Sequence, residues 1–189
     1  MITISEQTFK GKQYTESPLQ KAKYIDCEFQ NCSFLSSKLL DVEFLECIFT
    51  DCDLSLCNLG NTAFKDVQFV NCKLLGANFN DCNPFLLTLD FKSCNLGNAN
   101  FQGLKLKSIK FDGCELTGAD FSNCDLQLAA FPNCELVNTV FERTNLQKAD
   151  LSTAIGYVID PENNSLKGAQ FSRTGIEGLL QKYNIKITD

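Results

Sequence analysis

The sequence contains no histidine and no tryptophan among its 189 residues. Without histidine the chain lacks the most frequent general base and the usual partner of a serine or cysteine nucleophile. It also lacks the commonest metal ligand, and it has no glycine-rich loop of the kind that binds phosphates. We therefore expect a protein that is not an enzyme and that binds no metal or other cofactor.

Long apolar runs are missing as well. The N-terminal stretch MITISEQTFKGKQY has no hydrophobic core typical of a signal peptide, and no apolar run reaches the roughly 18 residues needed to cross a bilayer. The formal net charge is −6, with a pI near 4.7. This charge argues against direct nucleic-acid binding and favours partners with a basic surface. We expect a cytoplasmic protein that binds another protein, and neither a membrane nor nucleic acid.

What the sequence does contain is a repeat of five residues. Phe, Leu or Tyr occupies every fifth position from Phe9 to Phe79, and Phe or Leu does so from Phe91 to Leu151. We call these positions centres. The two runs are two residues out of phase, and the shift falls near Pro84. Helices and strands have periods of 3.6 and 2.0, so a period of five instead predicts a coil that turns a corner after every repeat.

The cysteines follow the same repeat. Ten of the eleven lie two residues before a centre, and Cys82 would do so if the first phase continued. At this small position cysteine alternates with Ala, Ser, Thr and Val, which share its size but not its ligand chemistry. Paired zinc ligands typically lie two to four residues apart, and an odd number of cysteines without an export signal argues against disulfides. We expect buried thiols that act as core residues, with a metal or redox role as the alternative.

This pattern resembles the pentapeptide-repeat family, and the segments GANFN (76–80), GADFS (118–122) and KADLS (148–152) match its repeat closely. The resemblance covers about residues 20 to 152 and returns at 166–172. It implies an all-β fold, a right-handed quadrilateral β-helix of about seven to eight coils, in which residues twenty apart stack. We assign residues 1–152 to the β-helix and 153–189 to a loop, a partial repeat and a short helical cap. Residues 1–20 are a candidate N-terminal cap, because Gln7, Lys12 and Ser17 are polar at the small position.

Within this family, the acidity and the C-terminal layout are similar to those of the Qnr quinolone-resistance proteins and the microcin immunity protein. That resemblance implies a DNA mimic that binds DNA gyrase or topoisomerase IV and relieves poisoning by a drug or toxin. Such mimicry needs acids on an outer face. Sorting the repeats into columns places these acids on two adjoining faces: Glu28, Asp51, Asp53, Asp90, Asp112, Glu115, Glu135 and Asp150. The alternative is a scaffold for an unrelated protein, whose outer polar residues serve solubility and whose binding patch lies near Pro84 or in the tail.

The C-terminal segment predicts a short helix with one apolar face. Its apolar residues lie at i, i+3, i+4 and i+7, namely Ile176, Leu179, Leu180 and Tyr183. This helix would cover the open end of the rod. Alternatively, it would form the contact of a homodimer, because an uncovered apolar end tends to associate with another apolar surface. The sequence also leaves open whether the shift near Pro84 produces a kink or a projecting loop.

Overall fold

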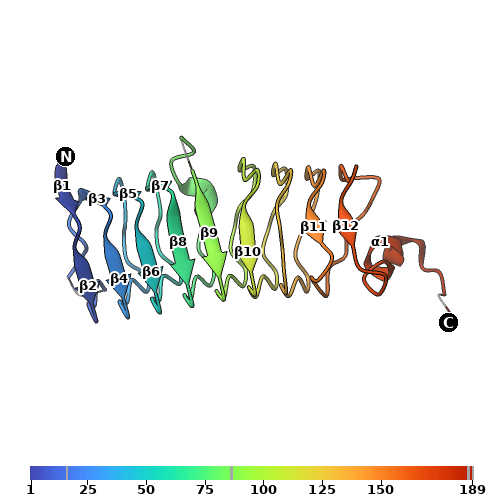
Figure 1. Ribbon diagram of the computed structural model, residues 1–189, viewed down its shortest axis with the longest axis horizontal. Helices are drawn as coiled ribbons and strands as arrows, with labels where there is room; N and C mark the ends of the chain where they lie inside the picture. The colour runs from blue at the N-terminus through green and yellow to red at the C-terminus, as the bar shows by residue number, and fades with distance from the viewer. Residues whose placement is uncertain (16, 86, 187, 189) are drawn as a thin grey trace.

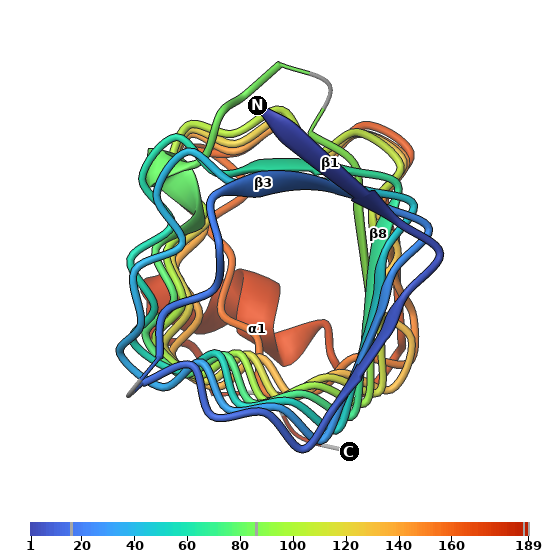
Figure 2. The ribbon, with the colours of Figure 1, turned by 90° about the vertical axis from the view of Figure 1, so that its left-hand side faces the viewer.

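The computed structural model describes residues 1–15, 17–85, 87–186 and 188. The chain winds into a right-handed parallel β-helix of about eight turns, as the five-residue repeat and the family resemblance predicted. Figure 1 shows the coils stacked along one axis from the N-terminus, and Figure 2 shows that each coil has four sides. We call these sides faces A to D, in the order in which the chain passes through them.

Short parallel strands line faces A and B. Face A carries β1 (Ile2–Ser5), β3 (Ala22–Ile25), β5 (Glu43–Leu45) and β7 (Ala63–Lys65). Face B carries β2 (Thr8–Lys10), β4 (Glu28–Gln30), β6 (Ile48–Thr50), β8 (Val67–Val70), β9 (Leu89–Lys92), β10 (Lys110–Asp112), β11 (Asp150–Leu151) and β12 (Gln170–Phe171). Neighbouring strands pair at a spacing of 20 residues, except β8 and β9, where Phe69 pairs with Phe91. Single bridges connect the coils on faces C and D, for example Ser33 to Asp53 and Lys38 to Asn58.

The corners between faces explain the period of five. At almost every corner the second residue after the centre has a positive φ, such as 54° at Ser36. At many corners the amide three residues after the centre donates to the centre's carbonyl, as Ser37 N does to Phe34 O at 2.8 Å. A positive φ at the third residue of such a turn defines type II. Asn, Asp, Ser and Gly predominate there, since they adopt this conformation at low cost.

The core is built from stacked centres. The rings of Phe29 and Phe49 stack at 4.7 Å, and the ladder continues across the phase shift, where Phe69 and Phe91 stack at 5.3 Å. All eleven cysteines are buried and free, so the prediction that they are core residues is confirmed. Among the described residues, no group of three or more His, Cys, Asp or Glu side chains could hold a metal ion.

At several small positions the side chain is a hydrogen-bond donor as well as a small group. The thiol of Cys57 donates to the carbonyl of Phe34 at 2.8 Å, and the hydroxyl of Thr62 donates to that of Leu39 at 2.7 Å. Burial raises the pKa of Cys57 to about 12, so the thiol keeps its proton and can donate it. Cysteine and threonine therefore alternate because each reaches a carbonyl of the preceding coil.

The phase shift produces a projecting loop. Asn83 N donates to Thr62 O at 2.9 Å, and Thr88 N donates to Phe64 O at 3.1 Å, so both ends of the loop stay attached to the preceding coil. Between them the loop stands out from face A (Figure 2), and the side chain of Phe85 is 76% exposed. A 3₁₀ turn, η1 (Phe79–Asp81), precedes the loop.

The C-terminal end is covered by α1 (Glu177–Leu180) and the 3₁₀ turn η2 (Gln181–Tyr183), which lie beyond β12 in Figure 1. Leu179 packs against the buried core from this segment. Within the described part of the chain, no helix has the length and apolar character needed to cross a membrane.

Candidate functional site

The structure places the eight predicted acids in columns on faces B and C and on the corner between them. Glu28, Asp90 and Asp150 occupy the outward column of face B, and Asp53, Glu115 and Glu135 that of face C. Asp51 and Asp112 lie on or beside the corner that joins these faces. Strands β4, β8 and β9 fix the spacing on face B, because parallel pairing aligns one outward side chain per coil.

Two of these carboxylates stabilise the fold. Asp53 Oδ1 accepts the backbone N–H of Ser55 at 2.9 Å, and Asp150 Oδ1 accepts that of Ser152 at 2.9 Å. The side-chain and backbone hydrogen bonds from Ser152 lower the pKa of Asp150. The amide oxygen of Asn58 makes the same bond at a corner where no charge is present. Asp and Asn before a centre therefore hold the following corner.

Three more acids have polar neighbours on the surface. Lys110 forms an ion pair with Asp112 at 2.9 Å, Asn95 donates to Glu115 at 2.6 Å, and Gln30 donates to Glu28 at 2.9 Å. Asp112 raises the pKa of Lys110 through this pair. In the described part of the chain, the carboxylates of Asp51, Asp90 and Glu135 have no ion pair. Among the eight acids only Asp112 forms an ion pair within the described chain, so the other seven carry unpaired negative charge, and Glu28, Asp51, Asp90, Glu115 and Glu135 are the exposed ones.

A more regular acidic array lies on the corner between faces A and B. It consists of Glu6, Asp26, Glu46 and Asp66, each exposed and with a φ between 51° and 53°. We call it the acidic corner. Backbone hydrogen bonds hold its residues in register, for example Glu6 N to Ile25 O at 3.0 Å and Asp26 N to Leu45 O at 3.0 Å. The sequence analysis missed it because it summed charge over whole faces, whereas the signal is an acid every twenty residues.

The projecting loop forms a second feature that the sequence analysis left unassigned. Beside Phe85 lies an open hollow of about 420 Å³ lined by Pro84, Phe85, Leu87, Gly103, Leu104 and Lys105. An aromatic side chain outside the five-residue phase was the available signal. Large apolar side chains that are this exposed often mark interaction sites.

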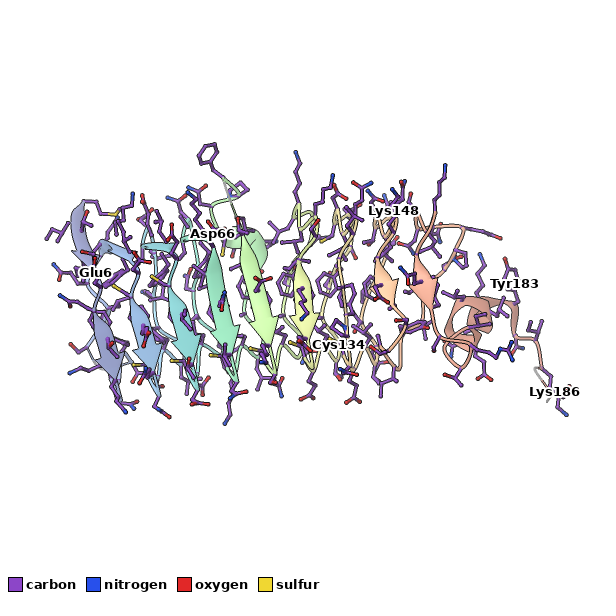
Figure 3. All side chains as sticks on the ribbon, viewed as in Figure 1. Glu6, Asp66, Cys134, Lys148, Tyr183 and Lys186 are labelled. Atoms are coloured by element: carbon purple, nitrogen blue, oxygen red, sulfur yellow. The ribbon has the colours of Figure 1, made fainter. Side chains whose placement is uncertain are left out.

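The C-terminal cap is held by polar contacts. Lys182 forms ion pairs with Asp160 and with Glu162, the second at 2.7 Å, and the Tyr183 hydroxyl donates to Glu162 at 2.9 Å. The hydrogen bond from Lys182 is the main reason why the pKa values of Asp160 and Glu162 are lowered. We call this group the C-terminal clamp. Figure 3 shows Tyr183 at this end of the rod.

The predicted cap residues differ in their exposure. Leu179 and Leu180 are half-buried, whereas the side chains of Ile176 and Tyr183 are 46% and 50% exposed. Leu180 also lines an open hollow of about 450 Å³ together with Tyr157, Val158 and Ile185. A role of this segment in pairing two copies stays a prediction.

Four-sided coils with stacked centres, small inner donors and polar outer columns define a pentapeptide-type β-solenoid. Three overlapping stretches, 22–101, 69–121 and 91–179, match the family described as the pentapeptide repeat region. The chain belongs to the pentapeptide-repeat family. No curated protein matches it in sequence.

Solved structures with the same fold include two relevant proteins. A trypsin-treated form of QnrB1, a plasmid-mediated fluoroquinolone resistance protein, is 19% identical with a TM-score of 0.65, over 98% of this chain and 100% of the other. HetL, a pentapeptide-repeat protein involved in heterocyst differentiation regulation in the cyanobacterium Nostoc sp. strain PCC 7120, is 16% identical with a TM-score of 0.69, over 90% and 85% of the two chains. At these identities the likeness concerns the fold.

Proposed function

We propose that this chain is a non-catalytic, protein-binding solenoid of the cytoplasm that mimics duplex DNA and occupies the DNA-binding surface of DNA gyrase or topoisomerase IV. The observation that carries the proposal is the set of exposed carboxylates on faces B and C, above all Glu28, Asp90 and Glu135. They project from a straight rod whose coils are about 4.8 Å apart. Each DNA strand carries one phosphate per about 3.4 Å of helix axis, so a surface built for phosphates can meet several of these acids at once.

The experiment is a supercoiling and cleavage assay with purified gyrase, with and without a fluoroquinolone. We expect the chain to restore supercoiling in the presence of the drug and to inhibit it at higher dose. Binding should weaken steeply with salt, because unpaired surface charges carry the encounter.

A charge-neutral triple variant tests which surface binds. Glu28→Gln, Asp90→Asn and Glu135→Gln together should reduce the affinity for gyrase about tenfold at low salt. The matched control removes three charges from faces A and D and their corners through Glu43→Gln, Glu46→Gln and Glu142→Gln, and should bind like the wild type. Equal losses in both variants would mean that net charge, and not this surface, drives binding.

The scaffold function is the second candidate, and the exposed Phe85 favours it. A DNA mimic needs no protruding aromatic, whereas partners of ordinary protein interfaces are often anchored by one. Absence of any gyrase or topoisomerase IV effect, combined with loss of a captured partner on Phe85→Ser, would establish the scaffold in place of the mimic.

A further inference from the structure

Opposite charges occupy the two halves of the corner between faces A and B. Before the projecting loop this corner carries the acidic corner, Glu6 to Asp66. After the loop it carries three exposed lysines, Lys107, Lys148 and Lys167, which we call the basic corner. Figure 3 shows Glu6 and Asp66 on the N-terminal side and Lys148 on the C-terminal side. In the described chain, none of these seven residues forms an ion pair.

The two halves correspond coil by coil. Counted from the loop, Asp66 lies one coil before it and Lys107 one coil after it. Asp26 and Lys148 lie three coils away on either side. The coils are counted from the hydrogen bonds between them, which connect residues about 20 apart in the sequence. Glu6 and Lys167 lie four coils away in the same manner. Lys65, beside Asp66, is the exception to the charge pattern among the described residues of the acidic half.

A surface of this kind is complementary to itself when one copy is turned end for end. We infer that the corner between faces A and B is the interface of an antiparallel homodimer, with the two-fold axis beside the Phe85 loop. Asp66, Asp26 and Glu6 then face Lys107, Lys148 and Lys167 of the second copy, as an isologous interface requires, while Glu46 lies at the level of Leu128. The interface is separate from the C-terminal segment and from faces C and D.

Apolar side chains lie where this arrangement needs them. Phe85 is 76% exposed and projects from face A at the coil of the axis, beside the hollow that Pro84 and Leu87 line together with Gly103, Leu104 and Lys105 toward the face D edge. Leu128 is 45% exposed at a φ of 62°, a conformation in which leucine is strained and Asn or Gly would be cheaper. Two coils from the axis, it meets Leu45 of the second copy.

Other occupants fit only half of this surface. An acidic protein would bind the lysines but be repelled by Glu6, Asp26, Glu46 and Asp66, and a basic partner would meet the reverse problem. Like charges brought together at an interface oppose binding strongly. A second copy matches both halves at once, and it alone places the loop at the centre of the contact.

The test is the molecular mass by analytical ultracentrifugation at about 50 mM and about 500 mM salt. We expect a dimer that weakens with salt. Lys148→Glu alone and Asp26→Lys alone should each weaken dimerisation about tenfold, and the double variant should restore it because it exchanges the two charges. Both changes are tolerated by the backbone, since Glu46 and Lys148 already occupy equivalent corner positions.

Two further variants complete the test. Phe85→Ser should weaken the dimer at both salt concentrations, and Glu135→Lys on face C should leave it unchanged. The inference is overturned if the wild type is monomeric at about 100 μM in low salt, or if the double variant fails to restore what the single variants lose. It is also overturned if the dimer resists these changes but is lost on Ile176→Ser with Tyr183→Ser.

Discussion

At the scale of single residues, each position of the repeat answers a separate physical demand. The centre needs volume. The small position needs a compact side chain, which at Cys57 and Thr62 also donates to the preceding coil. The second residue after the centre needs a positive φ. Leu56 meets this last demand poorly, with a φ of 55° and a side chain that is 63% exposed. Leucine in this region is strained by about 1–2 kcal/mol relative to its ordinary conformations.

Leu56→Asn should therefore raise the stability of the protein by about 1 kcal/mol, because asparagine tolerates this conformation better. The measurement is urea denaturation, in which the midpoint and the slope of the transition give the free energy of unfolding. The control is Leu35→Asn, which removes another exposed leucine from a corner position without a positive φ and should not raise the stability. A loss of stability at Leu56 would mean that its packing over Gly76 outweighs the strain.

At the scale of elements, apolar packing and the clamp both hold the C-terminal cap. Leu179 packs on the core, while Lys182 connects η2 to Asp160 and Glu162. Lys182→Met should increase hydrogen exchange across residues 176–184 at neutral pH, because two carboxylates lose their shared cation. Lys186→Met, outside the clamp, is the matched control and should leave exchange unchanged.

The clamp also predicts a pH dependence. The folded pKa values of Asp160 and Glu162 are lowered, so their contribution is present above the ordinary carboxyl range and is lost as pH falls below about 4. After correction for intrinsic rates, the wild type near pH 3 should exchange in this segment like Lys182→Met. Equal protection of the wild type and Lys182→Met, both at neutral pH and near pH 3, would show that the ion pairs do not hold the cap.

The individual elements also show which parts of the structure could be predicted from the sequence. The period of five predicted the coil and the buried cysteines, because local spacing decides which side chains point inward. The family resemblance predicted that centres twenty residues apart stack, as Phe29 and Phe49 do. The loop at Phe85 and the clamp at Lys182 depend on where the chain leaves and rejoins the last stacked coil, which spacing does not encode. The acidic corner was present in the sequence as a twenty-residue period, but only the stacked register shows that its members adjoin.

At the scale of the whole molecule, the direction of stacking makes the two ends different. Many small-position donors lean toward the N-terminal neighbour, as Cys32 does when its thiol donates to Phe9 O at 3.4 Å. In the first coil the small position has no preceding coil to contact. Its side chains therefore form the surface of the N-terminal end of the rod, which faces the viewer in Figure 2. Gln7, Lys12 and Ser17 are exposed there, which explains why the donors and small apolar residues of later coils give way to polar ones.

This polar layer should keep the N-terminal ends of two rods apart, since unpaired edge strands such as β1 and β2 otherwise invite pairing. Gln7→Val with Lys12→Val should therefore produce end-to-end association that persists at high salt, where the corner-to-corner dimer weakens. The control, Lys10→Val with Gln13→Val, makes the same chemical change on the sides of the first coil and should not associate in this way. Sedimentation at about 500 mM salt separates the two outcomes. Equal association of both double variants would show that added apolar surface alone is sufficient and that the end layer has no special protective role.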